Sequence, residues 1–395
     1  MTAKVLVTDG DQRAALAIVR SLGRAGYLAF VCSTDGRSLA GASRYARADL
    51  ALPSPLREPD RYGEAIEASV KNLGVDVVLP VTEAALLAVL PAGDRLAARV
   101  PFVDLDRFEA VSDKRHLLGI ASELGIAVPR QRVLSSRAAG HELVGDELRF
   151  PLVLKPSRSV VDGGRGRAQL AVDHVADQAQ LHECLGRVPE GSFPLLVQER
   201  VVGPGVGIFL LIWDGQLFGA FAHRRIREKP PSGGVSVYRE SIAADPELIA
   251  RSRDLLDHFG WSGLAMIEYK VAASTGTPYL MEINGRFWGS LQLAIDAGVD
   301  FPVLLTSLAM GQRPAPVTTY RVGVRSRWFW GDVDHLLARL RRSPAELALP
   351  PGSPGRWRAV RDFLTSWGPA DREEILRLDD PLPFVRESRT WFKEL

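Results

Sequence analysis

Three polar side chains at alternate positions near residue 283 are the strongest candidates for metal chemistry. The alternation of a β-strand would put Glu282, Asn284 and Arg286 on one face. A second apolar segment upstream holds Glu268, and turn residues between the two segments predict a hairpin. If this hairpin is symmetric about Thr275, Glu268 lies directly opposite Glu282.

Two like charges in a cross-strand pair destabilise a sheet, and a divalent cation between them would remove the conflict. Carboxylate and amide oxygens are ligands that favour Mg²⁺. The sequence therefore predicts a magnesium site on this hairpin. A bulge would break the register, and a solvated hairpin face with two unrelated glutamates is the alternative interpretation.

Lysine is scarce in this chain, with 7 lysines against 42 arginines, which makes each lysine informative. Lys155 ends a buried strand predicted over 150–156, and a glycine-rich segment follows it. Backbone N–H groups of such a segment can hold phosphate oxygens while a lysine supplies a point charge. The order differs from the P-loop, in which the lysine follows the glycines. The candidate phosphate-binding residues are Asp162, Gly163, Gly164 and Gly166. The alternative interpretation of this segment is a flexible hairpin without a ligand.

Another apolar segment, within 194–205, ends in polar residues and then glycines. A strand that ends in this way can present its backbone edge to a flat base, or it can be a core strand leaving its sheet. The residues at this end are Gln198, Glu199, Arg200 and Val201.

The segment 223–239 is the most cation-dense in the chain, and we interpret it as a loop that faces a substrate carboxylate. Arginine suits that role because its guanidinium group binds a carboxylate through two parallel hydrogen bonds. Arg225 and Arg239 are its candidate catalytic residues. A solvated basic loop is the alternative, since isolated charge runs are usually solvated.

The elements that must position these residues change in type near residue 112. The first hundred residues alternate strand and helix, which predicts a parallel sheet with right-handed crossovers. The predicted strands are 4–8, 27–32, 75–81 and 100–103, and the predicted helices are 11–25, 62–73 and 83–98.

From residue 112 a predicted helix, 112–124, precedes a region rich in strands and hairpins that continues to about residue 284. Asp214-Gly215 is a strong signal for a two-residue hairpin loop, and Pro246 suits the first turn of a helix over 246–259. Residues after about 316 hold five of the eight tryptophans. We expect these to be core residues, with a second-substrate pocket or an oligomer contact as alternatives.

Composition excludes several classes of protein. The formal net charge of +2 favours neither a nucleic acid nor a membrane surface as partner. Cys32 and Cys184 are too few for a disulfide framework, and no stretch of eighteen apolar residues or signal-peptide pattern occurs. Serine hydrolase and zinc hydrolase motifs are absent. We therefore expect a soluble cytoplasmic protein with no nucleic-acid or membrane partner.

Taken in order, these segments resemble the ATP-grasp superfamily, in particular its biotin carboxylase, carbamoyl phosphate synthase and carboxylate–amine ligase types. The resemblance covers roughly residues 1–315. The matching residues are Ser112-Asp113-Lys114, Val153-Leu154-Lys155-Pro156, Asp162–Arg167, Val197-Gln198-Glu199, Ile267-Glu268 and Met281-Glu282-Ile283-Asn284-Gly285-Arg286.

The resemblance implies an α/β and α+β fold in three parts. A Rossmann-like pre-ATP-grasp domain would cover 1–111. An ATP-grasp domain, whose two α+β subdomains clasp ATP, would cover 112–315, with a small lid subdomain at about 130–200. A C-terminal extension would cover 316–395.

The resemblance also implies roles for single residues. Lys114 and Lys155 would contact ATP phosphates, and the glycine-rich segment 162–167 would close over them. The strand end from Gln198 to Val201, with Glu199 and the backbone, would hold adenine. Glu268, Glu282 and Asn284 would bind Mg²⁺, or Mn²⁺ in its place, and Arg286 would stabilise charge on the transferred phosphate. Many members carry an acidic ribose-binding residue where this chain has Gly203-Pro204-Gly205, so the ribose contact stays open.

The implied activity is that of an ATP-dependent carboxylate–amine ligase that forms an acyl phosphate from a small-molecule acid and passes it to an amine. A bicarbonate-using carboxylase or a carbamoyl phosphate synthase-like component is the enzyme alternative. A nucleotide-binding regulatory module is the alternative without catalysis. A homodimer is compatible with each of these.

Overall fold

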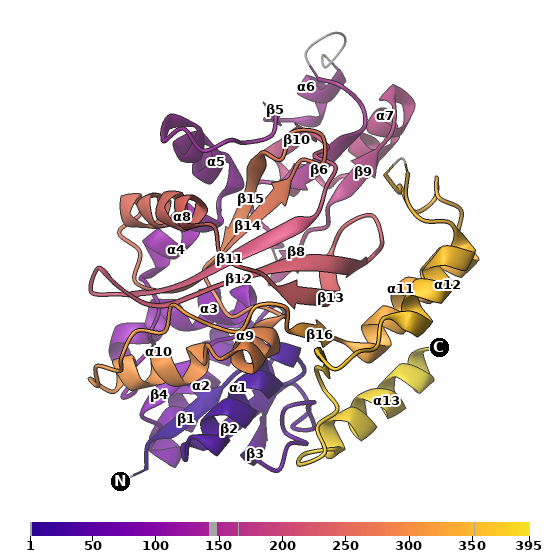
Figure 1. Ribbon diagram of the computed structural model, residues 1–395. Coiled ribbons are helices and arrows are strands. Elements are labelled where there is room, and N and C mark those ends of the chain that lie inside the picture. The colour runs from indigo at the N-terminus through magenta and orange to yellow at the C-terminus, as the bar shows by residue number, and fades with distance from the viewer. Residues whose placement is uncertain (1, 142–147, 165, 351) are drawn as a thin grey trace.

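A computed structural model describes residues 2–141, 148–164, 166–350 and 352–395 (Figure 1). In the orientation of Figure 1, a parallel sheet with its helices lies at the bottom, a large antiparallel sheet crosses the middle, and a small antiparallel sheet lies at the top. The candidate functional residues come mainly from the middle and upper layers.

The N-terminal layer is a four-stranded parallel sheet in the order β3-β2-β1-β4. Its strands are β1 (Lys4–Val7), β2 (Leu28–Ser33), β3 (Ala46–Ala51) and β4 (Val77–Leu79). Its helices are α1 (Arg13–Arg24), α2 (Pro59–Leu73) and α3 (Glu83–Val89). The next helix, α4 (Leu105–Ser112), packs against the middle sheet.

Three sequence predictions for this layer need correction. The edge strand β3 was not predicted, because Arg47 and Asp49 interrupt its apolar pattern. The predicted helix 83–98 ends as α3 at Val89 and continues as a 3-10 turn, η1 (Leu90–Arg95), where Pro91 lacks the N–H that an α-helix needs. The predicted strand 100–103 does not form, and only Arg99 makes a bridge to Val77.

The small upper sheet is antiparallel, with the order β5-β10-β6-β9. Two helices, α6 (Arg137–His141) and α7 (Gln178–Arg187), pack near it, and a separate two-stranded hairpin of β7 and β8 follows β6. The strands are β5 (Gln131–Leu134), β6 (Leu152–Pro156), β7 (Val160–Asp162), β8 (Arg167–Gln169), β9 (Asp173–Val175) and β10 (Leu195–Glu199); a 3-10 turn, η2 (Glu190–Ser192), precedes β10.

The middle layer is a seven-stranded sheet with the order β15-β14-β11-β12-β13-β16-β17. Its long strands are joined as hairpins, and Asp214-Gly215 forms the predicted two-residue loop, with positive φ at both residues. The strands are β11 (Gly205–Trp213), β12 (Gln216–Lys229), β13 (Val235–Ser241), β14 (Gly263–Val271), β15 (Pro278–Asn284), β16 (Arg325–Arg327) and β17 (Asp371–Glu373).

Helices connect and cover this sheet. The predicted helix 112–124 is α5 (Lys114–Glu123), which begins after α4 ends because Asp113 caps it by accepting the N–H groups of Arg115 and His116. The predicted helix 246–259 is α8 (Pro246–His258). The remaining helices are α9 (Leu291–Ala297), α10 (Phe301–Ala309), α11 (Phe329–Arg341), α12 (Arg356–Thr365) and α13 (Leu382–Glu394).

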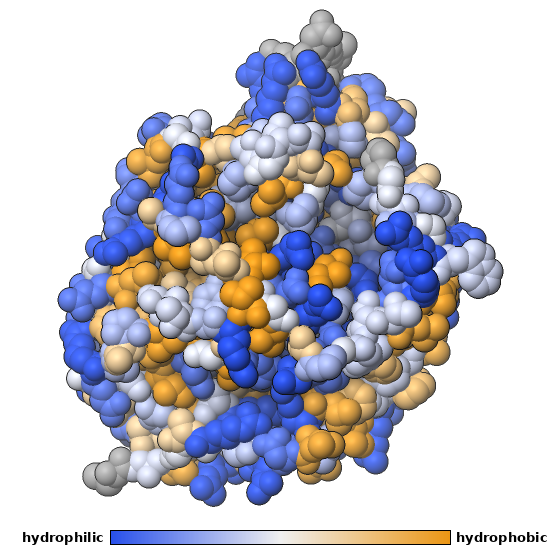
Figure 2. Space-filling model, in the orientation of Figure 1, coloured by the Kyte–Doolittle hydropathy of each residue, from blue (hydrophilic) through white to orange (hydrophobic). Residues whose placement is uncertain are grey.

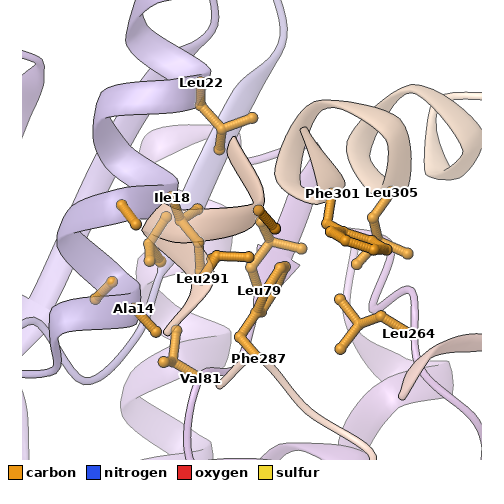
Figure 3. Close-up of a cluster of buried hydrophobic side chains, with 14 of the residues drawn as sticks. Ala14, Ile18, Leu22, Leu79, Val81, Leu264, Phe287, Leu291, Phe301 and Leu305 are labelled. Carbon is orange, nitrogen blue, oxygen red and sulfur yellow. The ribbon is translucent and has the colours of Figure 1, made fainter. Parts of the chain in front are cut away.

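One hydrophobic core joins the N-terminal layer to the middle sheet. Ala14, Ile18 and Leu22 lie one turn apart on the same face of α1, which packs on Leu291 of α9 and on α10 (Figure 3). Further members of this core are Leu79, Val81, Leu264, Phe287, Phe301 and Leu305. The packing fixes the carboxyl end of β4 and the start of α3 against the middle sheet.

The tryptophans near the C-terminus are core residues only in part. Trp330 stacks on Trp391 with 4.2 Å between ring centroids, and Trp328 donates to Glu387. Trp357 and Trp367 of the α12 region are 88% and 48% exposed, so the prediction of a core role is wrong for these two.

On the face drawn in Figure 2, hydrophobic residues are interspersed with hydrophilic ones.

Among the described helices, none is by itself long and apolar enough to cross a membrane, and only the bent pair α9 and α10, at 93°, meets the length and composition limits when taken together.

Candidate functional site

The acidic pair lies where the sequence predicts it. Glu268 of β14 pairs directly with Glu282 of β15. The assumption of a symmetric hairpin is wrong, because the register shifts by one residue between Glu268 and Tyr269. Tyr269 pairs with Leu280, so Met281 is the extra residue of a bulge, and its sulfur lies 3.8 Å from Nζ of Lys155.

Asn284 bridges the two carboxylates. Its Nδ2 donates to Oε1 of Glu268 over 3.1 Å and to Oε1 of Glu282 over 3.2 Å. Arg286 lies beyond the end of β15, so the strand does not continue as far as this residue. The guanidinium group still reaches the site, because Nη2 donates to Oδ1 of Asn284 over 3.0 Å.

Two lysines bring positive charge to the same point. Lys114 is the first residue of α5, and its Nζ lies 3.4 Å from Oε2 of Glu282 and 2.9 Å from Oγ of Ser159. Burial lowers the pKa of Lys155 to about 8, although Glu282 opposes that shift. Lys114 comes from α5, Lys155 from the small sheet and Glu282 from the middle sheet. The candidate site therefore lies where the two sheets meet.

The two carboxylates differ in their affinity for protons. Burial raises the pKa of Glu268, despite the neighbouring Arg225. Burial also acts to raise the pKa of Glu282, but Lys114 and Lys155 outweigh it and lower the pKa to about 2. Glu282 therefore stays ionised at neutral pH.

A glycine lets Arg225 reach the acidic pair from two strands away. Arg225 of β12 forms an ion pair with Glu268 of β14 and another with Glu228, at 2.9 Å. Between these strands lies Gly205 of β11, where a Cβ atom would lie 2.9 Å from Cδ of Arg225. A side chain at this position would obstruct the arginine. This contact gives Gly205 a structural role and leaves the ribose contact open.

The basic segment 223–239 is not a loop. It consists of the end of β12, a tip at 230–234 and the start of β13. Its cations have acidic partners, and the ion pairs are Arg224–Glu240, Arg225–Glu268, Arg227–Asp332, Lys229–Asp334 and Arg239–Glu374.

The structure brings only one of the two predicted arginines to the acidic pair. Arg239 is fully buried and contacts Glu374, which also binds Arg13 of α1. This cluster is formed with the C-terminal region. The catalytic role of Arg239 therefore has no geometric support, whereas Arg225 contacts Glu268.

The glycine-rich segment is the tip of the hairpin β7–β8, which packs against the N-terminal layer. The backbone N–H of Arg167 donates to the carbonyl of Leu56 over 2.6 Å, and its side chain reaches the carbonyls of Ala84 and Leu87. At Gly166 φ is +118°, and a Cβ would lie 2.6 Å from the carbonyl oxygen of Arg57. Gly163 and Gly164 are exposed at the tip, next to Asp162 at the end of β7; Arg165 lies outside the described residues.

The predicted adenine-binding segment lies at the end of β10, where the chain leaves the small sheet for the middle sheet. Gln198 donates to Gln131, and the Glu199 carboxylate accepts the backbone N–H of Arg149. Arg200 donates to the carbonyls of Ala348 and Ser232. These side chains are engaged within the protein, so recognition of a base here would fall to the backbone up to Val201.

The sequence analysis missed two titratable residues near the candidate site, His174 and Glu83. His174 of β9 has its pKa lowered to about 4 by burial and by Arg200, Lys270 and Lys155. An isolated histidine in a short strand carries no sequence signal. Glu83 lines the same hollow as Lys114, Glu282 and Arg286. A carboxylate at the start of the helix that follows a parallel strand is a signal that could have identified it.

The donor set is small for a metal site. No group of three or more His, Cys, Asp or Glu side chains converges as a metal site within the part of the chain that the structure describes. Two facing carboxylates and an amide oxygen nevertheless suit Mg²⁺, which is commonly held by one or two carboxylates together with phosphate oxygens. The amide of Asn284 can turn to present its oxygen beside Glu268 and Glu282.

Comparison with known proteins identifies the fold. Residues 192–330, which include all three candidate metal ligands, match a family described as ATP-grasp in the biosynthetic pathway with Ter operon. The structure is similar to the L-amino acid ligase from Bacillus licheniformis, with a TM-score of 0.62 and 18% sequence identity over 80% of this chain and 75% of that chain. The chain has the ATP-grasp fold. The fold class expected from the sequence is thereby confirmed.

Other proteins share the ATP-grasp fold with this chain. Biotin carboxylase from Campylobacter jejuni has a TM-score of 0.62 and 16% identity, over 82% of this chain and 74% of that chain. The biotin carboxylase domain of 2-oxoglutarate carboxylase from Hydrogenobacter thermophilus, solved with MgADP, ADP and bicarbonate, has a TM-score of 0.63 and 15% identity, over 82% and 73%. No curated protein matches the chain at a significant level in sequence.

Proposed function

We propose that this protein is an ATP-dependent ligase that activates a small-molecule carboxylate as an acyl phosphate and joins it to an amine, releasing ADP and phosphate. The observation that carries the proposal is the convergence of two carboxylates, an amide and four cations at one point between the two antiparallel sheets. These residues are Glu268, Glu282, Asn284, Lys114, Lys155, Arg225 and Arg286.

Glu268, Glu282 and Asn284 are the proposed ligands of Mg²⁺, with Mn²⁺ as the alternative ion. When bound, the ion would neutralise charge on the transferred phosphoryl group. The low pKa of Glu282 keeps its carboxylate ionised and available as a ligand. Asn284 already contacts both carboxylates, so it is positioned to complete the donor set.

Lys114 and Lys155 are the proposed contacts of the ATP phosphates, with the glycine-rich tip of β7–β8 above them. The end of β10, from Gln198 to Val201, is the proposed adenine-binding edge. Docking of the hairpin on the N-terminal layer would keep water from the reacting groups. A substrate carboxylate beside the γ-phosphate would lie near Arg225 and Arg286.

The proposed reaction has two steps. Attack of the carboxylate oxygen on the γ-phosphorus gives the acyl phosphate and ADP. Attack of the amine on the acyl carbon then forms the C–N bond and releases phosphate, and nearby cations stabilise the oxyanion that develops. The partners are thus a small-molecule acid and an amine.

We expect Lys155→Met to weaken binding of ATP, because it removes a point charge from the phosphates and keeps the volume of the side chain. The affinity of the wild type should also fall as pH rises through about 8, since Lys155 loses its proton there. Calorimetric titration of ATP at pH 7 and pH 9 measures both effects. Unchanged affinity in Lys155→Met, or the same pH dependence in both proteins, would mean that Lys155 is structural.

A substrate screen tests the function as a whole. We expect release of ADP to require a carboxylic acid and an amine, and mass spectrometry to detect the ligated product when a panel of amino acids supplies both. Release of ADP that depends on bicarbonate alone would favour the carboxylase alternative. Binding of ATP without release of ADP under any condition would favour the regulatory alternative.

The proposal keeps the division of the chain at 1–111, 112–315 and 316–395. Strand β16 of the last part pairs with β13, and β17 pairs with β16, so the two strands extend the middle sheet. The C-terminal part would thereby support Arg225 and the rest of β12 from the side opposite the acidic pair.

A further inference from the structure

Glu83 is a carboxylate in the candidate site that neither the proposed metal ligands nor the proposed phosphate contacts include. It is the first residue of α3 and reaches the site from the N-terminal layer. It lines a small open hollow together with Ser159, Glu282, Asn284 and Arg286. The hydrophobic core between α1 and α9 holds the N-terminal layer, and with it Glu83, against the middle sheet.

Within the part of the chain that the structure describes, no direct ion pair neutralises the charge of Glu83. Among the described residues, no Lys or Arg nitrogen lies within 4.0 Å of its carboxylate. The backbone of Val160, in β7, also lies near this carboxylate and acts to lower its pKa. Burial raises the pKa of Glu83, and the more distant Arg286 and Lys114 oppose that shift. A half-buried carboxylate without an ion pair attracts a cationic group.

Once the other polar residues of the hollow are assigned to the nucleotide and the metal ion, Glu83 remains available to a co-substrate. Under the proposed function, Lys114 is engaged by phosphate, and Glu282 and Asn284 by the metal ion. Arg286 and Glu83 are then the charged groups of the hollow that remain for the co-substrates. The two groups match the charges of the two co-substrates: the cation suits the anionic acyl phosphate, and the anion suits the protonated amine.

We propose that Glu83 binds the amine co-substrate as its ammonium ion and orients it toward the acyl carbon. This inference rests on the proposed ligase function and adds to it the class of the nucleophile, a cationic primary amine. For the step to balance, the ammonium gives one proton to Glu83, and its nitrogen lone pair forms the C–N bond. The bond between the acyl carbon and the phosphate oxygen breaks, its electron pair leaves with phosphate, and phosphate takes the second nitrogen-bound proton.

Glu83→Gln tests this role, because the amide keeps the size and shape of the side chain and removes the charge. Two probe nucleophiles of nearly equal size separate charge from shape. Methylamine is protonated at neutral pH, whereas hydroxylamine is mainly uncharged. Both are supplied with ATP, Mg²⁺ and the acid that the substrate screen selects, and product formation is measured by mass spectrometry.

We expect kcat/KM for methylamine to fall about 10- to 100-fold in Glu83→Gln, the loss typical of one charge-assisted contact. With hydroxylamine, formation of the hydroxamate should stay within about twofold of wild type, and so should calorimetric affinity for MgATP. Glu58→Gln is the matched control, since Glu58 lies at the start of α2 and pairs with Arg61 on the surface. It should leave both probes unaffected.

The outcomes separate this inference from the function on which it rests. A wild type that releases no ADP with any acid contradicts the ligase function itself. If the wild type is active and Glu83→Gln loses both nucleophiles equally, or neither, Glu83 does not bind the ammonium ion. Loss of MgATP affinity in the variant would assign Glu83 to the nucleotide site and overturn the inference in the same way.

Discussion

Glu282→Ala should abolish release of phosphate from ATP while the melting temperature without nucleotide stays near that of wild type. Glu282 is the carboxylate that stays ionised, so its loss removes the principal ligand of the proposed metal ion. Its removal also relieves the like-charge pair with Glu268, which offsets the lost contact with Lys114. A phosphate-release assay and thermal unfolding measure the two quantities.

The control for this variant is Glu240→Ala on the same sheet. Glu240 of β13 pairs with Arg224 and Arg325 and lies apart from the acidic pair. It should retain turnover. Full turnover in Glu282→Ala would remove the metal assignment, and a fall in melting temperature shared with loss of turnover would indicate a structural role instead.

The hairpin of β14 and β15 shows how much of the site can be predicted from the local sequence pattern. The pairing of Glu268 with Glu282 is confirmed, although the symmetry from which it was predicted is not present. Next to the turn the pairing is shifted by one residue from the symmetric register, and the bulge at Met281 restores the predicted pairing. Alternation and turn chemistry predict strands and their faces, but a bulge depends on what packs above it, here Lys155.

The basic segment shows where sequence reasoning ends. Its density of cations was visible, but the partners of Arg227, Lys229 and Arg239 lie more than one hundred residues away, in α11 and after β17. Composition cannot distinguish an arginine held by Asp332 from one that is free to bind a substrate. Only Arg225 reaches the acidic pair, and it does so across Gly205.

Glu83 illustrates the same limit for the site. The strand and helix around it were predicted from apolar spacing, and both form. That its side chain lines the same hollow as Arg286 depends on the packing of α1 against α9 and α10, which joins segments almost three hundred residues apart. The order of motifs along the chain predicts which residues belong to a site, whereas non-local packing decides what else faces it.

The path of one oxygen atom tests the reaction class. If the acid is the nucleophile at the γ-phosphorus, turnover should yield ADP and phosphate and no AMP or pyrophosphate. An oxygen of the carboxylate should move to the released phosphate, because the amine later cleaves the bond between the acyl carbon and that oxygen. Acid labelled with heavy oxygen reports this transfer as a mass shift in the phosphate.

Arg286→Ala should slow this labelled transfer by roughly 100-fold or more, as expected for loss of a preorganised charge next to the reacting phosphoryl group. Arg286 holds Oδ1 of Asn284, so Arg286→Lys should recover part of the rate if charge matters most and little of it if the guanidinium geometry does. Release of pyrophosphate would indicate an adenylating enzyme and contradict the proposed mechanism. ADP with unlabelled phosphate would mean that water or bicarbonate is the nucleophile, and the carboxylase or the regulatory alternative would then take precedence.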